Sequence, residues 1–289
     1  MTPTLLPLVL ARFFTPHLIA AVHVASAHYS PSGLNRMRWL ARHWCTRFVC
    51  VSNTVANGIF GTHESDLNHA RHVAVIPNAL NMIVMQAAAP YDWRVTVGWQ
   101  HDATVIGFAG RLSHNKGADV LLHAIALLHS QCSSVRLVIV GDGAEQANWM
   151  ALAERLGVGG ITHFAGRVPR DAIYSAIKGF DIAVVPSREE GFGLSALEAM
   201  AAGVPVVASR VDALQEVLQD GVTGLLCPVD DPHSLANALI RLISDIPLRK
   251  RMGAAGVAHA KQHYDIQAYK RQIATILEDI CLPSKQICL

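Results

Sequence analysis

Two glutamates, Glu190 and Glu198, flank a Gly-Phe-Gly turn within residues 181–209. An apolar strand precedes this turn, and the turn opens a helix that runs into a second apolar strand. Glycine allows the backbone to approach a ligand closely, and the free N–H groups at the start of a helix attract phosphate. Because carboxylates repel phosphate, we expect the two glutamates to bind the hydroxyl groups of a sugar or of ribose.

Two cations, Arg111 and Lys116, lie in a second motif at residues 106–122. A predicted strand ends just before Gly110, which turns the chain, and a helix is expected to begin near Gly117. Two cations that flank one helix N-terminus suit a diphosphate. The alternative is a pair of solvated cations on a surface loop.

The order of these motifs resembles the Glu-x7-Glu signature of family 4 retaining glycosyltransferases (glycosyl transferases group 1), which have the GT-B fold. The residues that carry the resemblance are PSREEGFGL (186–194) and EAMAAGVPVV (198–207). It implies an α/β protein with two Rossmann-like, doubly wound parallel-sheet domains. It also implies metal-independent transfer of a sugar from a nucleotide-diphosphate sugar to a lipid-linked, glycan or other hydroxyl acceptor. The alternative is an ordinary Rossmann crossover with two surface glutamates.

The resemblance assigns roles to four charged residues. Arg111 and Lys116 would stabilise the departing nucleoside diphosphate, which gains negative charge as the bond to the sugar breaks. Glu190 would bind hydroxyls of the transferred sugar, and Glu198 would bind the ribose hydroxyls. No nucleophile, general base or metal site is assigned, and no cofactor is expected besides the donor substrate.

A histidine and several backbone positions complete the predicted site. His23 lies in the apolar sequence AAVHVAS, at a place where the family often has a histidine near the sugar; His28 is a rival for that place, and a structural role is the alternative. For Gly141, a tight turn is as good an interpretation as ligand contact. The remaining residues predicted to bind the donor are Gly110, Gly166, Arg167, Val168, Gly191, Phe192, Gly193 and Leu194.

Short apolar runs that alternate with helical patterns predict parallel strands covered on both faces. Strands are expected at residues 18–26, 48–52 and 72–78, and then at 104–109, 136–141, 161–165, 181–186, 204–208 and 224–227. The predicted domains are a partial acceptor-side domain (1–79), a linker without periodicity (80–102), a donor-binding domain (103–262) and a final helix that crosses back to the first domain (263–289). The family's first domain begins with a strand and a glycine-rich loop that do not occur here, so the first domain is predicted to be incomplete.

Composition narrows the class of protein. The chain has 289 residues, of which 51% are hydrophobic and 16% charged, with a net charge of +2. Residues 1–100 hold seven Arg, no Lys and three acidic residues, a bias too mild to indicate nucleic acid but compatible with anionic lipid or a charged acceptor. The six cysteines form no CxxC pair, which argues against a zinc site or a disulfide framework.

No apolar stretch reaches the ~18–20 residues of a membrane span. We therefore expect a cytoplasmic protein. The Arg-rich predicted helix at residues 35–47, with Trp39 and Trp44, leaves a peripheral contact with the inner membrane surface open, beside the alternative of a solvated helix.

Three functional hypotheses remain at this point. The first is the glycosyltransferase; the second is a nucleotide-sugar-binding remnant that is inactive because it lacks the full acceptor domain. The third is a GT-B isomerase of the sugar-nucleotide 2-epimerase type, whose motifs differ from residues 187–198. A UDP-, GDP- or ADP-sugar would fit the donor motifs equally well, and neither sugar nor acceptor can be assigned.

Overall fold

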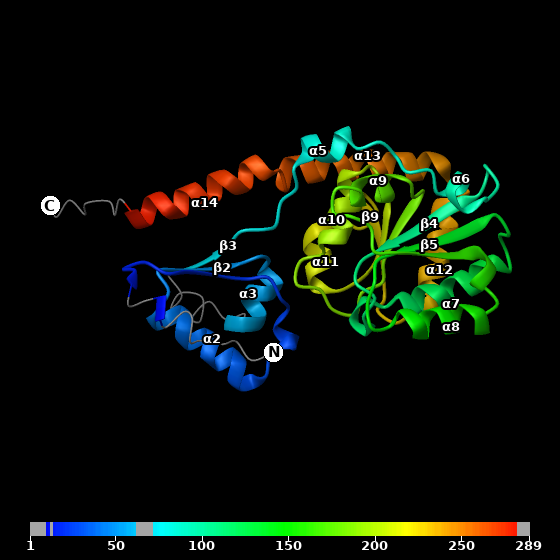
Figure 1. The fold of residues 1–289 in the computed structure, drawn as a ribbon. Coiled ribbons are helices and arrows are strands. Elements are labelled where there is room, and N and C mark those ends of the chain that lie inside the picture. Colours follow the sequence, from blue (N-terminus) through cyan, green and yellow to red (C-terminus); the bar gives the residue numbers. More distant parts are fainter. Residues whose placement is uncertain (1–9, 12–13, 62–71, 282–289) are drawn as a thin grey trace. The chain divides into compact units, whose positions relative to one another are not determined.

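A computed structural model describes residues 10–11, 14–61 and 72–281. It has the predicted α/β class, with two parallel sheets (Figure 1). The contacts divide the chain into two compact units. The first comprises Met1–Ala79, Glu190–Phe192 and Tyr264–Leu289, and the second comprises Leu80–Glu189 and Gly193–His263.

The first unit contains a three-stranded parallel sheet of order β1-β2-β3. The strands are β1 (Ile19–Val22), β2 (Arg47–Cys50) and β3 (Val73–Val75), all shorter than predicted. The crossovers between them hold η1 (Ser26–His28), α2 (Pro31–His43) and α3 (Asn53–Phe60). Helix α2 begins four residues earlier than predicted, because Ser30 caps it by accepting a hydrogen bond from the Gly33 amide and Pro31 fits the first turn.

The last helix packs within this first unit. The chain forms two helices here, α13 (Ile246–His263) and α14 (Ile266–Cys281), and α14 lies within the predicted final segment, residues 263–289. Ile276 and Ile280 of α14 form a small apolar cluster with Val49 and Ile76. Residues 282–289 of the predicted final segment lie outside the described part of the chain.

The second unit is a doubly wound sheet of six parallel strands in the order β6-β5-β4-β7-β8-β9. The strands are β4 (Thr104–Ala109), β5 (Val135–Val140), β6 (Thr162–Gly166), β7 (Ile182–Val185), β8 (Val206–Ser209) and β9 (Gly224–Cys227). The helices of this sheet are α7 (Ala118–His129), α8 (Gln146–Arg155), α9 (Ile173–Lys178), α10 (Leu194–Ala201), α11 (Asp212–Val217) and α12 (Pro232–Ser244). Figure 1 shows helices on both faces of the sheet, which explains why a central strand such as β7 is apolar and buried along its whole length.

Residues 80–102 contain structure that the sequence did not predict. They form two short helices, α5 (Met82–Ala87) and α6 (Trp93–Val97), capped by the side chains of Asn81 and Asp92. Both are too short to show a helical period. Met85 and Trp93 are buried, and the Trp93 indole donates a 2.9 Å hydrogen bond to the Ala176 carbonyl, so this segment belongs to the second unit.

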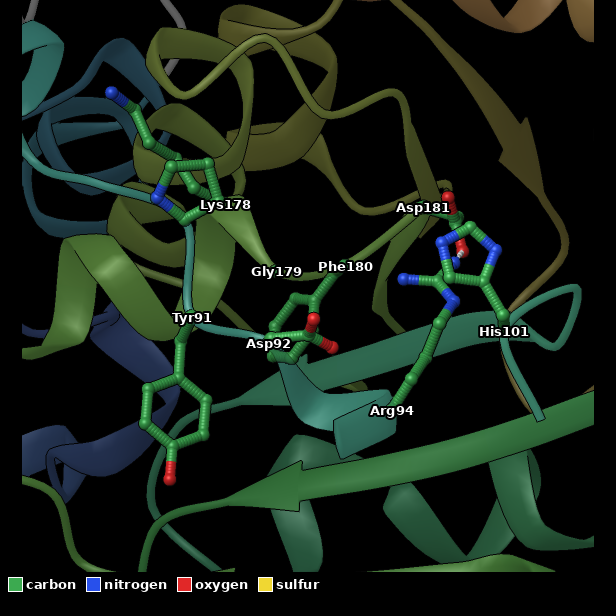
Figure 2. A pocket seen from close by; sticks show the side chains of 9 residues that line it. Tyr91, Asp92, Arg94, His101, Lys178, Gly179, Phe180 and Asp181 are labelled. Carbon is green, nitrogen blue, oxygen red and sulfur yellow. Dashed lines mark hydrogen bonds and ion pairs between the residues drawn. The ribbon is translucent and has the colours of Figure 1, made fainter. Parts of the chain in front are cut away.

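An ion pair ties this segment to the amino-terminal end of β7. Figure 2 shows Arg94 reaching toward Asp181, which directly precedes β7, and the two side chains are paired. Arg94 also donates to the Ala103 carbonyl at 2.9 Å, and Asp181 accepts from the Val105 amide at 2.8 Å. A cavity of about 440 Å³ adjoins the pair. Because these charges bind each other and the backbone, we interpret the ion pair as structural: it holds residues 93–97 against the sheet.

Candidate donor-binding site

The predicted donor residues follow neighbouring strands at one edge of the second sheet. The chain runs from β4 outward to β5 and β6, then returns to place β7 on the other side of β4. Ligands of doubly wound sheets bind outside the carboxyl ends of the strands at such a switch point. The loop after β4 holds Arg111 and Lys116, and the loop after β7 leads to Glu190.

A cavity of about 370 Å³ lies at the carboxyl ends of β4, β5 and β6. Five residues predicted from the sequence line it: Gly110, Arg111, Gly141, Arg167 and Val168. Val140, Asp142 and Ile173 complete the lining, and no motif had singled out Val140 or Ile173. The structure therefore brings together residues from three loops that are far apart in the sequence.

Gly141 has a structural reason to be glycine. Its φ is 133°, and a Cβ at this position would lie 1.8 Å from the Gly110 carbonyl oxygen. The loops after β4 and β5 thus touch through their backbones, and this contact fixes the floor of the cavity. Gly166, with a φ of 67°, has nothing within 4 Å of an added Cβ, so only its backbone conformation favours glycine there.

Lys116 is the last residue of a short 3-10 turn, η2 (His114–Lys116), that directly precedes α7. Gly117 caps α7 in the left-handed conformation, with a φ of 66°. A Cβ on Gly117 would lie 2.0 Å from the Pro186 carbonyl oxygen, so the loops after β4 and β7 meet here. Arg111 is exposed at the cavity and Lys116 is half-buried.

Gly193 begins α10 with a φ of 96° and offers no side chain to cap the first N–H groups of this helix. Leu194 follows it and is exposed. An uncapped helix start carries partial positive charge and donor groups, which suit an anion. The eight residues of α10 also carry Glu198 one turn further on.

Glu198 is half-buried, and burial raises its pKa to about 7, with the positive charge of Arg170 acting in the opposite direction. The pKa of Tyr174 is also raised, by burial first and then by the charge of Glu198. Arg170 and Tyr174 therefore belong to the surroundings of Glu198. Neither residue was predicted from the sequence; Arg170 lies in the turn before α9, and Tyr174 lies in α9.

Glu190, Gly191 and Phe192 group with the first unit by their contacts. There the Ser52 hydroxyl donates to the Gly191 carbonyl at 2.6 Å. A Cβ on Gly191 would lie 2.7 Å from the backbone oxygen of His23, which is exposed just after β1. His28, the rival histidine, lies in the 3-10 turn η1 and is exposed too.

The described residues were also compared with the arrangements that hold a metal ion or activate a thiol. No group of three or more His, Cys, Asp or Glu side chains there is arranged to hold a metal ion. Burial raises the pKa of Cys45 and Cys227 to about 11 and that of Cys50 to about 12, which makes these thiols inert at neutral pH. No described helix has the length and apolar character needed to cross a membrane.

Comparison with protein families now identifies the family. The model of the glycosyl transferases group 1 matches residues 92–259, more than half of the chain. The chain belongs to this family. The resemblance drawn from the two motifs is thereby confirmed.

Individual relatives agree with the family assignment. Proteins called D-inositol 3-phosphate glycosyltransferase are 39% identical over 254 residues in Corynebacterium aurimucosum and 39% identical over 185 residues in Kribbella flavida. These matches cover 81% and 61% of this chain, and 60% and 43% of the relatives. The chain thus spans about half the length of the curated relatives that it matches.

Solved structures share the fold. The Anabaena protein Alr3699/HepE, crystallised in complex with UDP and glucose, is 25% identical with a TM-score of 0.81 over 95% of this chain and 76% of that one. Sucrose-phosphate synthase from Thermosynechococcus elongatus, at 24% identity and a TM-score of 0.78 over 92% of this chain and 68% of that one, has the same fold. The GT-B type expected from the sequence is confirmed.

Proposed function

We propose that this group 1 glycosyltransferase chain binds a nucleotide-diphosphate sugar at the switch point of its second sheet and transfers the sugar, with retention, to a hydroxyl acceptor. The observation that carries the proposal is the cavity at the ends of β4, β5 and β6, which gathers Gly110, Arg111 and Arg167 beside the loops that hold Lys116 and Glu198.

Transfer requires charge to be stabilised where it develops. The acceptor oxygen forms a bond to the anomeric carbon while the bond from that carbon to the diphosphate breaks. The acceptor's proton passes to an oxygen of the departing phosphate. Arg111, Lys116 and the uncapped start of α10 supply fixed positive potential for the leaving group, which is the kind of stabilisation that contributes most to such reactions.

Hydroxyl groups of the donor would be held by the carboxylates. Glu198 accepts hydrogen bonds from the ribose, and Glu190 from the transferred sugar. Gly191, Phe192 and His23 are proposed to lie on the sugar side, and the backbone at Gly166–Val168 is proposed to contact the base. Gly141 is proposed to shape the cavity floor and to let the nucleotide approach the backbone.

The relatives suggest which donor and which acceptor to test first. Because structures of the Anabaena protein contain UDP or UDP-glucose, we propose a UDP-sugar as the donor to test first. D-inositol 3-phosphate, which the curated relatives carry in their name, is the first acceptor to test. A nucleotide-sugar-binding module without transfer activity is the second candidate, because the chain spans only part of those relatives.

Calorimetric titration with UDP, GDP and ADP tests the donor site. Lys116→Ala and Glu198→Ala each remove a charged hydrogen-bonding group and should weaken binding of the preferred nucleotide about ten- to a hundred-fold. Lys250→Ala is the matched control, because Lys250 is exposed on α13. A folded protein that binds none of the three nucleotides would refute the donor site.

Turnover separates the enzyme from the binding module. The chain is incubated with UDP-glucose and D-inositol 3-phosphate, and products are followed by NMR, in which the anomeric coupling reports retention. Transfer supports the enzyme. Tight binding of UDP with no transfer to this acceptor or to a panel of lipid and glycan acceptors supports the binding module.

A further inference from the structure

One arginine joins three segments at the carboxyl end of β7. Arg188 makes a bidentate contact with Asp119, in which Nη1 and Nη2 donate to the two carboxylate oxygens at 3.0 and 2.7 Å. Its Nε lies 2.7 Å from an oxygen of Asp230. Nη1 also donates to the His114 carbonyl at 2.6 Å, and the Arg188 amide donates to the Asn115 carbonyl at 2.8 Å.

The Arg188 guanidinium is largely buried, and its nitrogens have polar partners. The Arg188 side chain is 18% exposed and faces two carboxylates. Burial alone raises the pKa of Asp119, but the hydrogen bonds and charge of Arg188 outweigh it, so the pKa lies below its ordinary value. Asp230 is held in the left-handed region, with a φ of 57°, which aspartate tolerates better than most residues.

These contacts converge on the turn that carries Lys116. His114 and Asn115, whose carbonyls accept from Arg188, are the two residues directly before Lys116. On the other side of Lys116, Gly117 touches the Pro186 backbone. The turn is therefore held at both ends by the segment that continues two residues later into Glu190.

We propose that Arg188 is a positioning residue that fixes the Lys116 turn against the loop after β7, and thereby sets where the Lys116 ammonium meets the second phosphate of a nucleoside diphosphate. This inference rests on the proposed donor site. It adds a function for the Arg188–Asp119–Asp230 network, which neither the motifs nor the family assign.

The same strand offers a matched control. Arg94 and Asp181 form an ion pair at the amino-terminal end of β7 (Figure 2), with side chains that are 24% and 26% exposed. Arg188 and Asp119 are 18% and 27% exposed. Both pairs join an arginine to an aspartate and have similar burial, but only the one at the carboxyl end is bidentate and touches the Lys116 turn.

The experiment compares Arg188→Lys with Arg94→Lys. Lysine keeps the charge but cannot make the bidentate fork. Both variants should lower the melting temperature. A difference in nucleotide affinity between them therefore does not come from loss of stability alone. We expect Arg188→Lys to weaken UDP about ten-fold and to change UMP, which lacks the second phosphate, less than two-fold, whereas Arg94→Lys leaves both affinities unchanged. In a Lys116→Ala background, Arg188→Lys should weaken UDP no further, because its effect acts through Lys116.

Two binding results would overturn the inference: equal losses for UDP and UMP, or a loss that adds fully to that of Lys116→Ala. A wild-type chain that binds no nucleotide would refute the donor site instead. Hydrogen exchange of the ligand-free protein then still tests the network. We expect the amides of residues 113–117 to exchange about ten-fold faster in Arg188→Lys than in Arg94→Lys, and equal rates would show that Arg188 does not hold the turn.

Discussion

Replacing Glu198 with glutamine should make the protein more stable at neutral and alkaline pH. Burial raises the Glu198 pKa in the folded protein from its ordinary 4.5 to about 7. The free energy of unfolding is therefore unaffected by the Glu198 charge below about pH 4.5, where the carboxyl is protonated in both states. It falls as the pH rises from about 4.5 to 7, because the unfolded protein loses this proton more readily than the folded one. Glutamine keeps the shape and stays neutral, so it avoids the free-energy cost of a buried carboxylate.

The magnitude follows from the pKa difference. At 1.36 kcal/mol per pH unit, a pKa raised from 4.5 to about 7 costs at most about 3 kcal/mol. The stability difference between Glu198→Gln and wild type should thus grow by about 2–3 kcal/mol from pH 5 to pH 8, the range in which most of the cost develops.

Urea unfolding at pH 5, 6, 7 and 8, followed by tryptophan fluorescence, measures this difference. Trp149 is buried in the core of the second unit and reports its unfolding. Glu154→Gln, at an exposed glutamate on α8, is the control that makes the same chemical change outside the donor site. A Glu198→Gln curve that runs parallel to wild type from pH 5 to 8 would refute the reasoning, because it would mean that the carboxylate is not desolvated.

Further predictions concern the loops and the surface of the first unit. Gly141→Ala should destabilise the protein by about 1–3 kcal/mol more than Gly166→Ala in urea unfolding, because both positions have positive φ but only the Cβ at Gly141 meets backbone, 1.8 Å from the Gly110 oxygen; equal losses would contradict the close approach. Arg36 and Arg42 are exposed on α2. If this helix contacts anionic lipid, Arg36→Glu with Arg42→Glu should weaken sedimentation with phosphatidylserine vesicles at least ~30-fold, at about 1 kcal/mol per arginine, and unchanged binding would exclude the contact.

Most strands of the second sheet could be predicted because buried parallel strands contain continuous apolar runs, as in residues 137–140 and Ile182–Val185. Once the strands are placed, the residues after them must meet at one edge, which is why Gly110, Arg111 and Arg167 were found together. The short helix α6 was not predicted, because five residues are too few to show a helical period of apolar residues.

Contacts between distant segments account for the rest of what the sequence missed. The pairing of Arg188 with Asp119 joins residues 69 positions apart, and no local pattern indicates that these two charges meet. The pKa of Glu198 likewise depends on distant segments, because burial of this carboxyl raises the pKa and the charge of Arg170 lowers it.

The pairing of β4 and β7 explains why the donor site needs a side-chain network. Both strands lie wholly within the described residues, and they pair at two positions, Ile106 with Ile182 and Gly107 with Ala183. On its other side, β4 pairs with β5 at six positions that continue to Ala109. The ladder between β4 and β7 thus ends early, and the switch point opens where a ligand would bind. Beyond this ladder, the loops after β4 and β7 are joined by the hydrogen bond from the Arg188 amide to the Asn115 carbonyl, by the Arg188 side chain and by the Gly117–Pro186 contact. The short ladder between β4 and β7 thus accounts both for the proposed place of the donor and for the proposed role of Arg188.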